Sequence, residues 1–312
     1  WAAPLFVNEG GLLIVIDNRV AVALAPEVDP EEFFAVGFSG YERFIDNQYI
    51  GYISEGGVTA LEIANGLVGN PGVEWASPSF WSQFEILTND TFYNLQWNLN
   101  NTGQSGAKIG AHVGIEGAWQ YTTGSSDIVI AVLDTGVQVS HPDLAANIFV
   151  NAGEVVNGMD TDGNGFPDDI NGWNFFDGNN NPSPPGTTVA GAHGTAVAGV
   201  AAAVGSNSLG VTGASQHAKI LPIRIAGTPI NPTIVAFAQP EVIARAVYYA
   251  AGAVLNAQNQ IVGSWRGADV INASWGAATN TMLTAAFNWA TTSAKGGQGI
   301  PVFVATGNSA SG

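Results

Sequence analysis

Two short segments of the sequence carry side chains that together could move a proton. Asp134 ends the apolar run 128–133 and precedes a Thr-Gly pair, so its carboxylate is expected where a buried strand opens into a loop. His193 precedes the small residues of 194–200 and is expected near the start of a helix. A carboxylate that fixes the tautomer of an imidazole makes the imidazole a general base for a hydroxyl group. Taken singly, the aspartate is equally compatible with a turn cap, and the histidine with a helix cap or a packed side chain.

A third segment could donate a hydrogen bond to a developing negative charge. Asn308 follows the apolar run 301–305 and a Thr-Gly pair, which predicts a side-chain amide at the end of a buried strand. Acyl transfer requires such a donor where the carbonyl oxygen of the substrate becomes negative. An asparagine in a tight turn after glycine is the alternative interpretation. The segment 270–276 lies between these motifs and, by itself, is also typical of a core strand that ends in a turn.

In this order, the segments 128–136, 193–195 and 302–308 resemble the aspartate, histidine and oxyanion-asparagine motifs of the subtilisin-like serine proteases. The resemblance identifies 270–276 as the strand whose backbone pairs with an extended protein or peptide substrate. The implied site residues are Asp134, His193 and Asn308 for catalysis and Ser274, Trp275 and Gly276 for substrate binding, with Ser274 not the nucleophile. The resemblance covers most of the chain, firmly over 89–308.

The motif that carries the nucleophilic serine in this family is expected after Asn308, and neither Ser309 nor Ser311 has the flanking residues of that motif. The sequence therefore predicts that this chain alone is inactive. Two function classes remain open. One is a calcium-stabilised extracellular serine endopeptidase in precursor form, whose serine lies on a further part, such as a C-terminal fragment. The other is a catalytically inactive subtilisin-like scaffold used for binding or extracellular assembly.

Residues 160–169, Asp-Thr-Asp-Gly-Asn-Gly-Phe-Pro-Asp-Asp, are typical of a calcium-binding loop. Oxygen-bearing side chains at positions one, three, five and nine, with glycine at position six, match the first part of an EF-hand loop. Position twelve is Asn171 instead of the bidentate glutamate, so the EF-hand is incomplete. A solvated acidic turn is the alternative. The predicted ligands are Asp160, Asp162, Asn164, Asp168, Asp169 and the backbone carbonyl of Phe166.

A second calcium site is implied by the family resemblance alone. Asp143 matches a calcium-ligand aspartate of many subtilisins, and the loop 204–211 matches the ligand loop with Asn207 as its side-chain ligand. The loop is about one residue longer than the usual pattern. Zinc is not expected, because no histidine has a cysteine or a second histidine at ligand spacing.

Apolar runs that alternate with helical stretches predict an α/β fold with a subtilisin-like doubly wound parallel sheet from residue 127 onward. The predicted strands are 128–133, 220–225, 270–273 and 301–305, and the predicted helices are 194–203, 241–251 and 281–294. Residues 127–312 would form the catalytic domain without its C-terminal part, and 85–126 the junction and the N-terminal segment of that domain.

Residues 1–84 predict a small ferredoxin-like α+β domain, in the order strand, helix, strand, strand, helix, strand. The expected elements are strands at 12–16 and 20–24 around a turn at 17–18, a helix from 29, one or two strands within 43–54, a helix at 58–68 and a strand at 73–76. The segment 70–78 resembles the end of subtilisin-family propeptides, which implies an inhibitory propeptide, cut between Phe80 and Asn89. An unrelated α+β module is the alternative.

Composition narrows the function classes. The 312 residues carry a net charge of −17 with only eight lysines and arginines, so binding to a nucleic-acid backbone is not expected. There is no cysteine, which excludes disulfides and thiolate metal sites, and calcium could supply the cross-links of a secreted protein instead. No apolar run is long enough to span a membrane, and the first residues do not have the pattern of a signal peptide.

Overall fold

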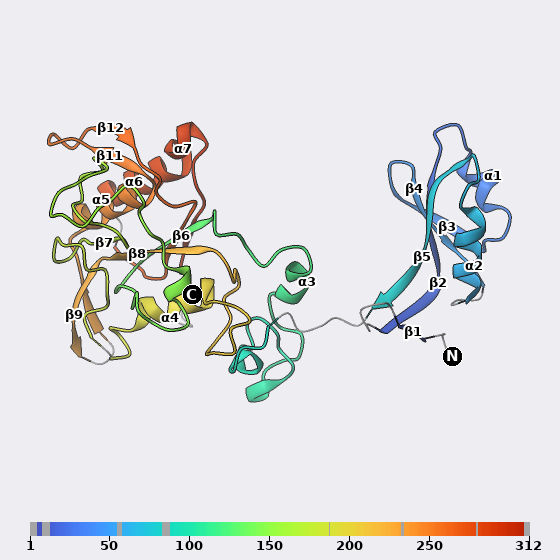
Figure 1. Ribbon diagram of the computed structural model, residues 1–312, viewed down its shortest axis with the longest axis horizontal. Helices are drawn as coiled ribbons and strands as arrows, with labels where there is room; N and C mark the ends of the chain where they lie inside the picture. The colour runs from blue at the N-terminus through green and yellow to red at the C-terminus, as the bar shows by residue number, and fades with distance from the viewer. Residues whose placement is uncertain are drawn as a thin grey trace. The chain divides into compact units, whose positions relative to one another are not determined.

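The computed structural model describes residues 5–7, 13–54, 58–82, 88–186, 188–231, 234–278 and 280–308. The chain divides into two compact units, Trp1–Glu85 and Ile86–Gly312 (Figure 1). Each unit has its own hydrophobic core. In the described residues, no helix combines the length and the apolar character that crossing a membrane requires.

The first unit is an antiparallel sheet with both of its helices on one face (Figure 1). Its elements are β1 (Leu5–Val7), β2 (Leu13–Leu24), α1 (Pro30–Phe34), β3 (Gly40–Ile45), β4 (Gln48–Tyr52), α2 (Val58–Leu67) and β5 (Val73–Ser82). Strand β2 lies between β5 and β4, and β3 pairs with β4. From β2 onward, the elements follow the order that the sequence predicts, with β1 as an additional strand.

The predicted turn at Asp17 and Asn18 is wrong, because both residues belong to the continuous strand β2. The Asp17 carboxylate accepts hydrogen bonds from the backbone and the guanidinium of Arg19, two residues further along the same strand. The backbone carbonyl of Asn18 accepts a hydrogen bond from the N–H of Ile53. Two polar residues are therefore accommodated by a shift in the register with β5 between Ile16 and Val20.

The second unit is built on a parallel sheet with the strand order β14-β13-β6-β8-β7. Its strands are β6 (Val129–Asp134), β7 (Trp173–Asn174), β8 (Lys219–Arg224), β9 (Ala226–Asn231), β10 (Ile234–Phe237), β11 (Ala253–Leu255), β12 (Ile261–Ser264), β13 (Val270–Ala273) and β14 (Val302–Val304). Its helices are η1 (Tyr93–Leu95), η2 (Gln104–Gly106), α3 (Ile115–Trp119), η3 (Ala145–Asn147), α4 (His193–Ala202), α5 (Pro240–Ala250), α6 (Thr281–Thr292) and α7 (Ala294–Gly297). All four predicted strands are neighbours in this sheet, which confirms the predicted α/β class.

Alternate residues of β6 point to opposite faces of the sheet, as the two-residue period of a strand requires. Leu133 and Ala131 join the core formed with α5 and α6, whereas Val132 packs against α4. The sheet is therefore covered on both faces, which explains why its strands are almost continuously apolar in the sequence. The predicted helix 281–294 ends earlier, at Thr292, where Ser293 leaves the helical backbone conformation.

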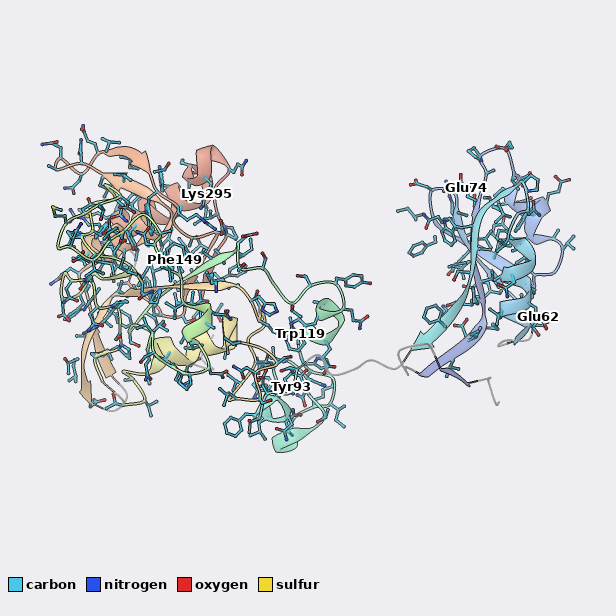
Figure 2. The ribbon with its side chains drawn as sticks, in the orientation of Figure 1. Glu62, Glu74, Tyr93, Trp119, Phe149 and Lys295 are labelled. Atoms are coloured by element: carbon cyan, nitrogen blue, oxygen red, sulfur yellow. The ribbon has the colours of Figure 1, made fainter. Side chains whose placement is uncertain are left out.

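The residues before β6 are held by a small aromatic core of their own. The rings of Tyr93 and Trp119, both labelled in Figure 2, lie 5.9 Å apart and pack with Leu99. The indole of Trp119 donates a hydrogen bond to the carbonyl of Ala214 at 2.9 Å. This segment is thereby attached to the loop that follows α4.

The contact between β7 and β8 depends on a glycine. Gly172 has a φ of +100°, and a Cβ atom there would overlap the carbonyl oxygen of Pro222 on β8. Gly158 has a φ of +78° but open space around it.

We expect Gly158→Ala to lower the free energy of unfolding by about 1–2 kcal/mol, the cost of left-handed backbone alone. Gly172→Ala should lower it by more, because the new methyl group separates β7 from β8. Urea unfolding measures the difference, and equal losses would contradict this explanation.

Candidate active site and metal site

The end of β6 and the start of α4 bring Asp134 and His193 into contact. Asp134 is the last residue of β6, and His193 is the first residue of α4. The imidazole Nδ1 lies 2.7 Å from the carboxylate Oδ1. The aspartate side chain is 1% exposed and the histidine side chain 48% exposed, so the carboxylate is buried and the imidazole reaches solvent.

The surroundings of Asp134 favour a positive charge on the imidazole. Its Oδ1 also accepts a hydrogen bond from the backbone N–H of Thr135 at 2.7 Å, whereas its buried Oδ2 has no hydrogen-bond partner among the described residues. The hydrogen bond to Asp134 and the charge of that carboxylate raise the pKa of His193 above its ordinary value of 6.5, against the opposing effect of burial. In the described part of the chain, the Nε2 of His193 has no hydrogen-bond partner. This arrangement suits a general base whose second nitrogen is available to a hydroxyl group.

The predicted oxyanion donor lies on the same edge of the sheet. Asn308 is exposed and follows β14, whose carboxyl end points the same way as that of β6 because the strands are parallel. Within the described residues, Asn308 makes no hydrogen bond to Asp134 or His193. Ser309 and Ser311 lie outside the described residues.

The predicted substrate-binding residues directly follow β13. The Ser274 hydroxyl accepts a hydrogen bond from the Asn272 amide at 2.9 Å. The side chain of Trp275 is 8% exposed, and its indole donates to the Leu133 carbonyl at 2.7 Å. Gly276 is exposed, with open space around its Cα. Trp275 is therefore part of the core, and Gly276 is the exposed residue of the three.

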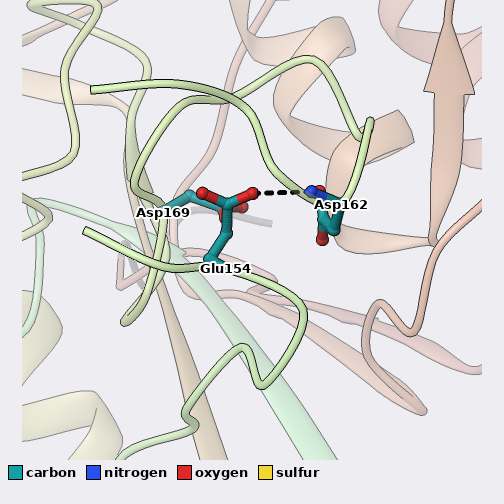
Figure 3. Close-up of side chains that lie close together, drawn as sticks. All are labelled: Glu154, Asp162 and Asp169. Carbon is teal, nitrogen blue, oxygen red and sulfur yellow. Dashed lines mark hydrogen bonds between the residues drawn. The ribbon is translucent and has the colours of Figure 1, made fainter. Parts of the chain in front are cut away.

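Residues 154–169 form an acidic loop that brings three carboxylates together. Oxygen atoms of Glu154, Asp162 and Asp169 lie within 4.8 Å of one another (Figure 3). The Glu154 carboxylate accepts hydrogen bonds from the backbone N–H groups of Thr161 and Asp162 at 2.7 and 3.0 Å. Asn164 is almost fully buried, and its amide donates to Asp169 at 2.9 Å. Hard oxygen donors at such spacing suit Ca²⁺.

The loop brings together only part of the ligand set that the sequence predicts. Asp162, Asn164 and Asp169 converge, and Asp160 lies beside Asp162, since both carboxylates accept from the N–H of Asn164, whereas Asp168 is not among the three clustered carboxylates. The Asp160 carboxylate accepts from backbone N–H groups of its own loop, and that of Asp168 accepts from two N–H groups of the preceding turn. Glu154 was missed by sequence reasoning, because it lies before the acidic run and outside the EF-hand spacing.

Phe166 anchors the acidic loop to the core. Its ring lies 5.1 Å from Phe175 and 4.7 Å from Tyr249 of α5, as edge-to-face pairs. The Tyr249 hydroxyl donates to the Asp169 carboxylate at 2.5 Å. Burial raises the pKa of Asp169 to about 6, although the hydrogen bonds from Tyr249 and Asn164 act in the opposite direction. In the absence of a cation, the buried carboxyl group therefore retains its proton unusually well.

The second predicted calcium site is a compact loop around Asp143. The amide of Asn207 donates to Asp143 Oδ1 at 2.8 Å, and the N–H of Val211 donates to Oδ2 at 2.9 Å. Asp90 also contacts this loop by accepting from the N–H groups of Ser206 and Asn207 at 3.0 and 2.9 Å. The structure thus brings Asp143 and Asn207 together, and it adds Asp90, which sequence reasoning missed.

Comparisons with known proteins identify the family of the second unit. Residues 125–312 match the model of the subtilase family. The chain is 31% identical over 251 residues to a thermophilic serine proteinase of Bacillus sp. (strain AK1), covering 80% of this chain and 47% of that protein. It is 35% identical over 136 residues to subtilisin-like protease 1 of Plasmodium berghei (strain Anka), covering 43% of this chain and 20% of that protein.

A solved structure of a protease from Pseudoalteromonas arctica PAMC 21717 superposes with a TM-score of 0.50 at 28% identity, covering 71% of this chain and 59% of that one. The chain spans less than half the length of the curated relatives that it matches. Because the family model matches more than half of the chain, this protein belongs to the subtilase family of subtilisin-like serine proteases.

Proposed function

We propose that this chain belongs to a calcium-stabilised, extracellular serine endopeptidase in precursor form, with its nucleophilic serine outside these 312 residues. The observation that carries the proposal is the contact of 2.7 Å between Asp134 and His193 at the carboxyl edge of the parallel sheet. Functional groups of open parallel sheets gather at this edge.

Asp134 and His193 would act together in acyl transfer. The buried carboxylate holds the Nδ1–H of the imidazole, so that Nε2 is free to accept the proton of an attacking hydroxyl group. The imidazolium formed in that step is stabilised by Asp134, in line with the raised pKa of His193. The same nitrogen then returns the proton to the leaving amine. Asn308 would donate its side-chain amide to the oxyanion that forms on the substrate.

The substrate would be a protein or peptide bound as an extended strand. The residues after β13, Ser274 to Gly276, offer backbone groups at the same edge as Asp134. Main-chain pairing of this kind supplies affinity without selecting a particular side chain. The proposal therefore assigns binding to this backbone and assigns no preference for the residue before the scissile bond.

The first unit would serve as the propeptide of the same protein. It has its own core of buried residues and is a separate compact unit, as a domain that is later removed requires. Strand β5 continues to Ser82, well beyond the predicted end at Ala76, and so includes the first residues of the region between Phe80 and Asn89 in which the cut is predicted. Residues 83–87 of that junction lie outside the described residues.

Calcium would stabilise the second unit at the acidic loop and around Asp143. The cluster of Glu154, Asp162 and Asp169 fits a divalent cation, because three carboxylates converge where burial opposes their charge. A bound cation would neutralise this repulsion and cross-link the loop. The chain has no cysteine and so no disulfides, and bound calcium would supply the cross-links that a secreted protein otherwise takes from them.

A fluorophosphonate probe, which labels activated serines, tests the proposed peptidase. We expect intact-mass analysis to find this chain unlabelled and a co-purifying polypeptide labelled. His193→Ala should reduce that labelling by a factor of about 10³ or more, because the nucleophile loses its base. His112→Ala is the matched control, since its ring contacts the Leu99 carbonyl far along the chain from the site, and it should leave labelling unchanged. Labelling that is absent throughout would support the inactive scaffold instead.

The calcium proposal predicts a pH-dependent stabilisation. Because the folded pKa of Asp169 is raised to about 6, the calcium-free chain loses stability as the pH rises from about 4 through about 6. Calcium requires the ionised carboxylate, so the increase in melting temperature with calcium should grow from about pH 5 to about pH 7, reaching several degrees. Scanning calorimetry in calcium and in chelator measures it.

Two neighbouring aspartates give a matched pair for this test. Asp169→Asn should remove the part of the calcium-dependent increase in melting temperature that comes from the acidic loop, which is the part that grows from about pH 5 to about pH 7. Asp168→Asn should retain it, because that carboxylate bonds the preceding turn instead of joining the cluster. Equal losses in both variants would favour the ligand set predicted from the EF-hand spacing. An unchanged melting temperature of the native chain in calcium would contradict the proposal.

A further inference from the structure

The hydroxyl group of Thr135 lies between the two segments that carry Asp134 and His193. Thr135 is 1% exposed. Its Oγ1 donates to the carbonyl of Gly191 at 2.8 Å and accepts from the N–H of Gly194 at 3.0 Å. These two glycines precede and follow His193 in the chain. One hydroxyl group therefore holds the backbone on both sides of the residue that carries the imidazole.

Helix α4 depends on this hydroxyl group because it has no side-chain cap of its own. The residue before the helix is Ala192, which cannot accept a hydrogen bond through its side chain. The first N–H groups of a helix have no partner within the helix and are usually capped by a nearby serine, threonine, aspartate or asparagine. Thr135 supplies the acceptor to Gly194 from the end of another element, so the cap also joins α4 to β6.

The first turn of α4 packs so closely against the end of β6 that there is no room for a side chain at Gly194. A Cβ atom at Gly194 would lie 2.5 Å from the carbonyl oxygen of Gly136 and 2.9 Å from the Cβ of Asp134. The hydroxyl of Thr195 accepts a hydrogen bond from the N–H of Gln138 at 3.0 Å. The helix start is therefore pressed against the loop after β6, and outward movement of this turn would separate the imidazole from the carboxylate.

Thr135 contacts Asp134 itself and, on the side of His193, only the backbone of Gly191 and Gly194. Its backbone N–H donates to the Asp134 Oδ1, the same oxygen that lies 2.7 Å from the His193 Nδ1. We propose that Thr135 is a positioning residue, whose hydroxyl group ties the first turn of α4 to the end of β6 and thereby holds His193 against Asp134. The inference rests on the proposed function, in which this pair is catalytic.

The pKa of His193 reports this contact directly in the full chain. Both effects that raise it come from Asp134, the sole charged group in the described residues that acts on it. NMR titration of the four histidine side chains measures it without any need for activity. Thr135→Val removes the hydroxyl group and should lower the pKa of His193 by at least about half a unit, about threefold in proton affinity. Thr135→Ser keeps the hydroxyl group and should restore the native pKa.

Thr212 provides a matched control. It is fully buried, and its Oγ1 has no hydrogen-bond partner among the described residues. Thr212→Val therefore removes a buried hydroxyl group without disturbing α4 or β6, and the pKa of His193 should stay at its native value. A decrease equal to that in Thr135→Val would show that the titration reports general loosening of the unit, and it would overturn the inference.

The remaining outcomes separate the inference from the proposed function. If Thr135→Val keeps the native pKa of His193 while its free energy of unfolding falls, the hydroxyl is merely structural and the inference is wrong. If the native His193 itself titrates at its ordinary value, the pair is not formed and the proposed function fails as well. Should Thr135→Val not fold, amide hydrogen exchange at Gly194 in the native chain decides. Strong protection is expected, and exchange at the rate of an uncapped helix start would overturn the inference.

Discussion

The close packing of α4 against the end of β6 is the constraint on which the rest of the site depends. Along α4, Ala198 and Ala202 are fully buried against the sheet, where they meet Val132 and Ile220. Small side chains let the helix axis lie near the strands, and Gly194 extends this approach to the first turn. A larger residue on this face would move the helix outward. The small residues on this face of α4 therefore determine how far apart the backbones of Asp134 and His193 lie, and with them the carboxylate and the imidazole.

That packing also explains how the protein tolerates a buried charge. A carboxylate removed from water is costly unless donors surround it. Asp134 receives one backbone N–H and the imidazole, and both act on the same oxygen. Its other oxygen is buried without a partner among the described residues. A positive charge on His193 stabilises this carboxylate, which is why the pKa of His193 is raised.

The sequence alone predicts the parts of this structure that depend on local patterns. The run 128–133 is apolar throughout because both faces of β6 are covered, and Asp134 interrupts it at the point where the strand ends. The acidic loop shows the limit of such reasoning. Its spacing indicates a cation, but Asp160 and Asp168 serve backbone N–H groups of nearby turns, and Glu154 enters the cluster from outside the run. Which carboxylate faces the cluster is decided by how the loop folds back, and this is not encoded in spacing. The same holds for Asp17, whose bond to Arg19 keeps a polar pair within β2.

The acidic loop and the strand end that carries Asp134 share one core, through which the proposed cation would stabilise the site. The loop has little regular secondary structure and is held by side-chain bonds to its own backbone and by the ring of Phe166. That ring packs on Tyr249 of α5, and α5 packs on the face of β6 that carries Leu133, the residue before Asp134. Loss of order in the loop would remove the ring of Phe166 from its packing against this core. In a chain with a net charge of −17 and no cysteine, the proposed cation would reduce the repulsion among the three carboxylates and would hold the ring of Phe166 in place. The strand end that carries Asp134 gains its rigidity from the same packing.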